Sequence, residues 1–244
     1  MLSPAGTFRG LFVTGTDTGV GKTIATGVLA VSLREVGVNA GVMKPVETGV
    51  TPRRRSDSEW LMSVAPSDDP CELVAPYRLR ASAAPMVAAA AEDLTIDLMC
   101  IRSAFEQLAS RHDCVLIEGV GGALVPLTPD ILVADLIQHL RLPVLIVARS
   151  GLGSINHTLL TVECLKSRGI PILGVLFNNA IAPTDNPDIH QTTRTILVKT
   201  GLRSFGELPY ADGMPATWDR ERSRLMAQVD TQGLLEALGF RKVA

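Results

Sequence analysis

Short apolar runs alternate with longer segments of helical spacing along most of this chain. Five of these runs predict β-strands, at residues 9–14, 39–44, 114–117, 142–148 and 170–177. The segments between them predict α-helices at residues 22–36, 56–64, 85–91, 97–111, 155–167 and 231–238. Residues 181–187 are Pro-rich and predict a loop, and the polar segment 212–224 favours a flexible stretch.

Apolar strands that alternate with helices form βαβ units around a buried parallel sheet. We therefore predict an α/β fold with a mostly parallel sheet and helices on both faces, as a single domain over residues 1–244. Right-handed crossovers bring the carboxyl ends of the strands to one edge of the sheet. Functional side chains are expected directly after strands, at that edge.

The composition narrows the class of protein. With 23 basic and 25 acidic residues the net charge is −2, which argues against a general nucleic-acid binder. No apolar run approaches the roughly 18 residues of a membrane span, and residues 1–7 lack signal-peptide features, so we expect a cytoplasmic protein that binds neither nucleic acid nor membrane. The cysteines match no zinc or redox spacing and predict reduced, mostly buried thiols, at Cys71, Cys100, Cys114 and Cys164.

A phosphate-binding loop follows the first strand and opens the first helix. Residues 15–23 read GTDTGVGKT, with five residues between the first glycine and Gly21 where the common pattern has four. Backbone N–H groups of such a loop and the following helix N-terminus bind phosphate oxygens. Lys22 can reach the β- and γ-phosphates, and Thr23 can offer its hydroxyl to Mg²⁺. The alternative is a glycine-rich turn without a ligand.

Two carboxylates are candidates for the magnesium site. Glu118 follows the apolar strand 114–117 and precedes a glycine-rich stretch, where Mg²⁺-binding carboxylates of phosphoryl-transfer enzymes stand; alternatively, it is an exposed turn residue. Asp57 is the second candidate, and capping of the helix that follows, by Ser56 or Asp57, is an equally strong alternative for this position. Asp17, inside the phosphate loop, could brace the backbone or take part in catalysis.

Lys44 ends the second predicted strand, in the segment KPVETG at residues 44–49. In a parallel sheet that position shares an edge with the phosphate loop. A lysine there can neutralise the charge that develops on a transferred phosphoryl group. A solvated lysine at a strand end is the alternative.

Four blocks together resemble the dethiobiotin synthetase family: TGTDTGVGKT at residues 14–23, KPV at 44–46, EGVGG at 118–122 and LGSINHTLLT at 152–161. The resemblance implies a homodimer of P-loop NTPase-type domains with the site at or near the interface. It implies an ATP- and Mg²⁺-dependent ligase that closes the ureido ring of dethiobiotin from 7,8-diaminononanoate (diaminopelargonate) and CO₂. The family's reaction passes through a carbamate and a carbamic–phosphoric anhydride.

The resemblance also implies roles for individual residues. Lys44, Lys22 and Thr18 would be catalytic, and Thr23, Asp57 and Glu118 would hold Mg²⁺. The diamine would contact Thr48, Gly122 and Asn156. Besides Lys22, Thr23, Asp57 and Glu118, the nucleotide would contact Gly19, Val20, Gly21, Ile24, Gly119, Val120, Gly121, Asn178, Asn179, Leu208, Pro209 and Tyr210.

Two departures from the family and two rival classes stay open. Gly19 replaces an acidic residue of some members, and residues 83–86 read AAPM where the family has a Ser-Pro-His stretch. One rival is an ATP-dependent switch protein of the partition or division class, although residues 15–20 lack the signature lysine of that class. The other is a generic small-molecule kinase, which leaves the block at 152–161 unexplained.

Overall fold

The computed structural model describes residues 2–4, 8–53, 55–180, 182 and 189–242. Its central sheet has six strands in the order β3 (Ala40–Met43), β6 (Cys114–Gly122), β2 (Gly10–Gly15), β7 (Val144–Ala148), β8 (Ile172–Asn178) and β9 (Ser204–Leu208). Every neighbouring pair in this sheet is parallel. All residues of β2, β3 and β7 are buried, as expected of a parallel sheet that is covered on both faces.

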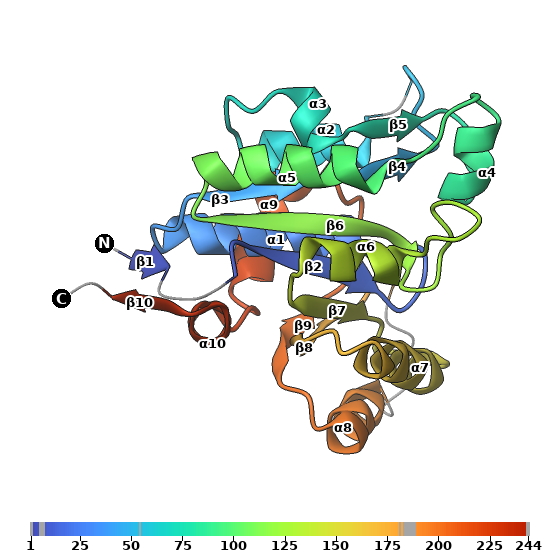
Figure 1. Cartoon of the computed structure of the whole chain (residues 1–244). Helices are drawn as coiled ribbons and strands as arrows, with labels where there is room; N and C mark the ends of the chain where they lie inside the picture. Colours follow the sequence, from blue (N-terminus) through green and yellow to red (C-terminus); the bar gives the residue numbers. More distant parts are fainter. Residues whose placement is uncertain (1, 5–7, 54, 181, 183–188, 243–244) are drawn as a thin grey trace.

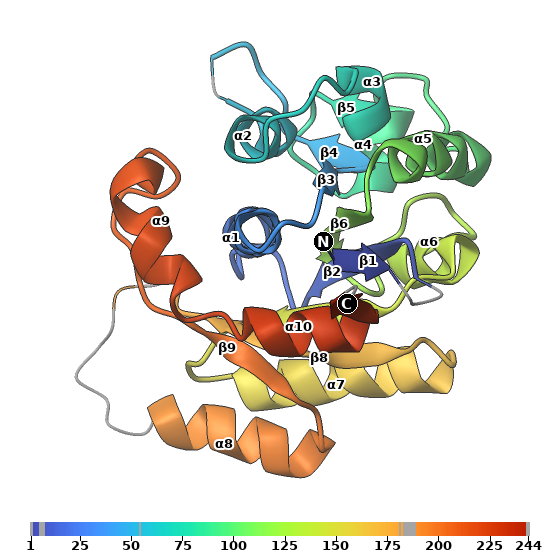
Figure 2. The same ribbon diagram turned by 90° about the vertical axis from the view of Figure 1, so that its left-hand side faces the viewer.

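Helices cover both faces of the sheet (Figures 1 and 2). On one side, α1 (Lys22–Glu35) contacts α2 (Asp57–Val64), α9 (Trp218–Met226) and α10 (Thr231–Leu238). Figure 2 shows α5 (Leu98–Arg111) and α6 (Val133–Leu140) on the opposite side. The remaining long helices, α7 (Ser154–Ser167) and α8 (Ile189–Thr200), pack against each other.

Smaller elements surround this core. A parallel pair, β4 (Val46–Thr48) with β5 (Tyr77–Leu79), contacts α4 (Pro85–Ala90), while α3 (Cys71–Val74) packs against α5. The two ends of the described chain meet in an antiparallel pair, β1 (Leu2–Pro4) with β10 (Phe240–Lys242).

The predicted α/β class is confirmed, and each predicted strand and helix has a counterpart in the structure. The strand expected at 114–117 is longer, because its glycine-rich continuation keeps pairing up to Gly122 opposite Gly15. The expected loop at 181–187 lies outside the described residues, apart from Ala182.

One prediction was wrong. The segment 212–224, expected to be flexible, contains most of helix α9. Although the segment is polar, Trp218 and Leu225 are buried, and the Trp218 ring meets that of Trp60 edge to face at 5.3 Å. Two large anchors bury enough apolar surface to hold a short polar helix against the core.

The cysteines differ in part from the prediction. All four are free thiols, but only Cys114 is buried, and Cys100 is exposed. Burial, reinforced by the nearby carboxylate of Asp113, raises the pKa of the Cys114 thiol to about 12. In the part of the chain that is described, no helix has the length and apolar character needed to cross a bilayer.

Candidate active site

The phosphate loop joins β2 to α1 and ends at Gly21, the N-cap of α1. Gly21 has φ of 87°, and a Cβ there would lie 1.9 Å from the amide nitrogen of Asn178, so both the backbone and the space require glycine. No side chain caps α1. Its first N–H groups therefore remain available to an anion bound in the loop. Thr18 and Gly19 are exposed on this loop, whereas Val20 is buried.

Lys22 turns back into its own loop. Its Nζ donates a hydrogen bond to the Asp17 carbonyl at 3.0 Å, and the residue is buried. Burial, together with the positive charge of Lys44, lowers the pKa of Lys22 to about 8. The Asp17 carboxylate accepts the Thr18 N–H at 2.7 Å and lies 3.4 Å from Arg149, which is the geometry of a residue that braces the loop.

Lys44 is not a solvated strand-end lysine. It follows β3 with its side chain 5% exposed, and its Nζ lies 2.5 Å from Glu118 Oε1 and 3.3 Å from Asp57 Oδ2. Burial alone would lower the pKa of Lys44, but Glu118 and Asp57 outweigh it and raise the pKa above its ordinary value. Lys44 therefore remains a cation in the interior of the protein.

Glu118 lies within β6 and is also buried, so it is not an exposed turn residue. Its Oε1 accepts hydrogen bonds from Lys44 and, at 2.8 Å, from Thr23 Oγ1. Its Oε2 is buried and has no hydrogen-bond partner among the described residues. An unpaired carboxylate oxygen in the interior is costly unless a ligand completes it.

Asp57 is the first residue of α2, and its carboxylate does not cap that helix. The cap is Ser56, whose Oγ accepts the Glu59 N–H, while the Glu59 carboxylate accepts the Ser56 N–H in a capping box. Asp57 is left to face Lys44, with its side chain 46% exposed. Of the two alternatives for this helix start, the structure assigns the cap to Ser56.

The three predicted magnesium ligands thus gather around Lys44, and their chemistry fits that ion. They offer oxygen atoms only, which Mg²⁺ prefers, and the unpartnered Oε2 of Glu118 is among them. Among the described residues, no group of three or more His, Cys, Asp or Glu stands ready to hold a metal. Mg²⁺ at Thr23, Asp57 and Glu118 would need the phosphates to complete its ligands.

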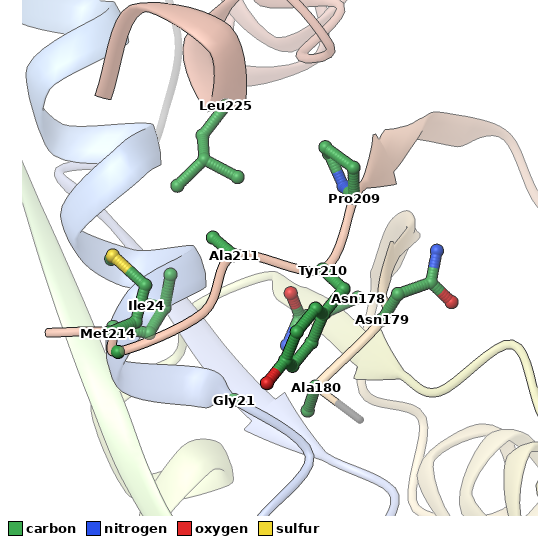
Figure 3. Close-up of a pocket in the computed structure, with 11 residues that line it drawn as sticks. Gly21, Ile24, Asn178, Asn179, Ala180, Pro209, Tyr210, Ala211, Met214 and Leu225 are labelled. Carbon is green, nitrogen blue, oxygen red and sulfur yellow. The ribbon is translucent and has the colours of Figure 1, made fainter. Parts of the chain in front are cut away.

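A pocket of about 230 Å³ opens beside the phosphate loop (Figure 3). Six of the predicted residues line it: Gly21, Ile24, Asn178, Asn179, Pro209 and Tyr210. Five more were not predicted: Ala180, Ala211, Gly213, Met214 and Leu225. The pocket lining combines the apolar side chains of Ile24, Met214 and Leu225 with the polar groups of Asn178, Asn179 and Tyr210.

Leu208 stands apart from the other residues predicted to contact the nucleotide. Its side chain is fully buried in β9 and does not line the pocket; only its carbonyl, which accepts the Asn179 N–H at 3.0 Å, supports the pocket wall. Hydrogen bonds fix the side chains of the two asparagines that line the pocket. Asn178 donates to the Val20 carbonyl at 2.9 Å, and Asn179 donates to Glu207 at 3.1 Å.

The remaining predicted residues lie at the same sheet edge or near it. Gly122 pairs with Gly15 beside the phosphate loop, and the Gly119 carbonyl is 3.4 Å from Lys44 Nζ. Val120 and Gly121 follow in β6 and are half-buried. Thr48 ends β4, and Asn156 is exposed in the first turn of α7. Within the described residues, neither Thr48 nor Asn156 has a hydrogen bond to the Lys44 group.

One residue that sequence reasoning missed is Glu47. It is buried in β4, and its carboxylate accepts the N–H of Asp57 and, at 2.6 Å, the hydroxyl of Ser58. The only sequence signal is an acidic residue three positions after Lys44, and nothing local indicates that it contacts α2.

Known proteins resemble this chain in fold and in sequence. The MinC:MinD cell division complex of Aquifex aeolicus superimposes with a TM-score of 0.58 at 16% identity, over 96% of this chain and 97% of that chain. The cell division ATPase MinD of Pyrococcus furiosus gives a TM-score of 0.55 at 16% identity, over 95% and 98%. At such low identity these likenesses establish the fold alone, that of the P-loop NTPases.

Sequence comparison is more specific. A family model described as an AAA domain matches residues 9–216. The ATP-dependent dethiobiotin synthetase of Anaeromyxobacter sp. (strain Fw109-5) is 41% identical over 91% of this chain and 99% of its own length. The enzyme of the same name from Methanocaldococcus jannaschii is 42% identical over 69% of this chain and 78% of its own. The chain therefore belongs to the family of ATP-dependent dethiobiotin synthetases.

Proposed function

We propose that this protein is an ATP- and Mg²⁺-dependent cyclo-ligase that forms the ureido ring of dethiobiotin from 7,8-diaminononanoate and CO₂. The observation that carries the proposal is the buried pair Lys44 and Glu118, which Asp57 and Thr23 join beside the phosphate loop. Membership of the dethiobiotin synthetase family supports this choice of reaction. The whole chain, residues 1–244, would act as one domain.

The chemistry needs three steps. One amine of the diamine attacks CO₂ and loses a proton, giving a carbamate. A carbamate oxygen then attacks the γ-phosphorus of ATP, the bond from that phosphorus to the β,γ-bridging oxygen breaks, and ADP leaves. The second amine attacks the carbon of the resulting carbamic–phosphoric anhydride, inorganic phosphate leaves with the bonding electrons, and a proton is released as the ring closes.

Positive charge and alignment are what the phosphoryl step requires of the protein. Lys22 would stabilise charge on the β- and γ-phosphates, and the Thr18 hydroxyl would contact the γ-phosphate. Lys44 would bind the carbamate and the phosphoryl group that joins it. Its fixed place between Glu118 and Asp57 means that little reorganisation is needed when charge develops. When bound, Mg²⁺ would neutralise phosphate charge, held by Thr23, Asp57 and Glu118.

Binding of the substrates would use the loops around this group. Gly119–Gly122 would approach the phosphates and the diamine through backbone groups, and Thr48 would offer a hydroxyl to the diamine. The nucleotide base would occupy the 230 Å³ pocket, between Tyr210 and the side chains of Ile24 and Met214, with Asn178 and Asn179 as its polar contacts.

We further propose that the protein acts as a homodimer, with Asn156 of one subunit binding the substrate carboxylate of the other. Two large apolar side chains, Leu152 and Leu160, are exposed on either side of Asn156 on α7 and the loop before it. An apolar surface at this place suits a contact between subunits.

ATP turnover with different additions tests the proposal. The ligase predicts ADP release that requires both the diamine and bicarbonate, with one dethiobiotin formed per ADP. The rival class of partition or division switches predicts ADP release that is stimulated by DNA or lipid vesicles and indifferent to the diamine. The second outcome would overturn the proposed function.

A further inference from the structure

The first turn of α2 is held by two separate devices. Ser56 and Glu59 form the capping box, which satisfies the N–H groups of these two residues. Glu47 reaches in from β4 and accepts the N–H groups of Asp57 and Ser58 as well as the Ser58 hydroxyl. Together, Ser56, Glu59 and Glu47 provide acceptors for N–H groups that have no partner within the helix at its start.

A buried carboxylate such as that of Glu47 is an unusual acceptor for the N–H groups at a helix start. The residue is 4% exposed, and none of the described ion pairs includes it. A buried carboxylate is costly, and here it is stabilised by backbone N–H groups, a hydroxyl and the positive end of a helix. A serine cap is already present, so stability of α2 alone does not call for a buried charge.

The position of Glu47 has a consequence for Asp57. A carboxylate in the first turn of a helix ordinarily competes for the free N–H groups there. Because Glu47 and Ser56 already occupy those N–H groups, the Asp57 carboxylate is left free. It faces the other way and meets Lys44 Nζ at 3.3 Å.

We propose that Glu47 is a positioning residue of the ligase reaction, which holds the backbone of Asp57 so that the Asp57 carboxylate faces Lys44 and the magnesium site. This inference rests on the proposed function, because it gives Asp57 a ligand's role. Glu47 itself touches neither the substrates nor the metal; it acts through the Asp57 N–H and the Ser58 side chain.

The Glu47→Gln variant tests the proposal, because glutamine keeps the shape of the side chain but removes one acceptor oxygen. Metal affinity is measured by electron paramagnetic resonance of Mn²⁺ in the presence of ADP. The Mg²⁺ concentration for half-maximal dethiobiotin formation is measured alongside it. We expect both constants to rise about tenfold, the size typical of residues that orient metal ligands.

The matched control is Glu59→Gln, which weakens the other device in the same helical turn. We expect it to lower the thermal unfolding midpoint much as Glu47→Gln does, while both metal constants stay at wild-type values. Should Glu47→Gln fail to fold, Ser58→Ala removes the 2.6 Å hydrogen bond to Glu47 together with the 3.0 Å contact to Ser56 Oγ, leaves the Glu47 side chain in place, and should raise the constants in the same direction.

Three outcomes overturn the inference: unchanged metal constants in Glu47→Gln, equal shifts in Glu59→Gln, or a further rise when Glu47→Gln is added to Asp57→Ala. The last would show that Glu47 does not act through Asp57. If wild-type protein forms no dethiobiotin, the proposed function fails instead, and the Mn²⁺ measurement still decides the role of Glu47.

Discussion

The strands β3 and β6 carry a buried polar group at each of their two ends, and the two groups differ in how well they are satisfied. Before these strands, His112 contacts Asp69 at 2.7 Å and Asn39 at 2.9 Å, and Asp69 also accepts from Ser67 and lies 3.5 Å from Arg111. Every polar side-chain atom of this amino-end group that is buried has a partner among the described residues.

After the same strands lie Lys44, Glu118 and Asp57. Here one Glu118 oxygen has no partner in the described part of the chain, and Lys22 and Lys44 lie close enough that the charge of Lys44 lowers the pKa of Lys22. The amino-end group is complete and therefore suits a structural role. The carboxyl-end group is incomplete and suits a ligand that carries phosphates and a divalent cation.

Among variants that distinguish the amino-end group from the carboxyl-end group, Lys44→Ala is expected to have the largest effect. Loss of one cation at the transferred group typically costs about 3–4 kcal/mol of barrier, or 10²–10³ in rate. We expect dethiobiotin formation to fall by at least that factor while the far-ultraviolet circular dichroism spectrum remains that of the wild type. Near-wild-type turnover would refute the role of Lys44.

Asp57→Ala comes next. The variant keeps the capping box of α2, so we expect it to fold, but it removes one of the proposed metal ligands. The Mg²⁺ concentration for half-maximal activity should rise by at least about tenfold. A magnesium titration that superimposes on that of the wild type would leave Asp57 as a partner of Lys44 only.

At the other end of the strands, Asp69→Asn should affect stability and not catalysis. The side chain is 3% exposed and bonded to His112, and hydrogen bonds to a charged group contribute about 1.5–3 kcal/mol. We expect the free energy of unfolding to drop by about 2 kcal/mol in urea titrations, with kcat per folded molecule unchanged. A lower kcat in fully folded Asp69→Asn would contradict a purely structural role of the amino-end group.

The smallest effect is the pH dependence of the stability difference between the wild type and Asp69→Asn. Burial would raise the pKa of Asp69, but bonds from Ser67 and His112 and the charge of Arg111 outweigh it and hold the pKa below its ordinary 3.8. The unfolded chain therefore binds this proton first as the pH falls. The stability difference between wild type and Asp69→Asn should be full above about pH 4 and shrink as the pH falls through the folded-state pKa. A difference that grows in acid would contradict the assignment.

Much of the carboxyl-end group could be predicted from sequence, because its members stand next to strong local signals. Lys22 and Thr23 end a glycine-rich loop, and Lys44 follows a short apolar run. Glu118 also directly follows a short apolar run, although its strand continues to Gly122. Parallel topology then brings the ends of these strands together.

The residues that escaped prediction are those whose partners lie far along the chain. Glu47 acts on a helix that starts ten positions later. Met214 and Leu225 line the pocket beside the phosphate loop, and they come from or directly follow the polar segment 212–224, whose composition did not indicate the helix α9. The burial of the Leu208 side chain was not predicted either, because alternate side chains of a strand point to opposite faces and the sequence does not show which face is buried.

Mass spectrometry of the reaction product tests the central claim most directly. Purified wild-type protein is incubated with diaminopelargonate, bicarbonate and Mg²⁺, with each nucleoside triphosphate in turn, and Lys44→Ala serves as the inactive comparison. The account predicts a dethiobiotin mass that appears with ATP and depends on both the diamine and Lys44. The absence of that product from folded, ATP-binding wild-type protein would contradict it.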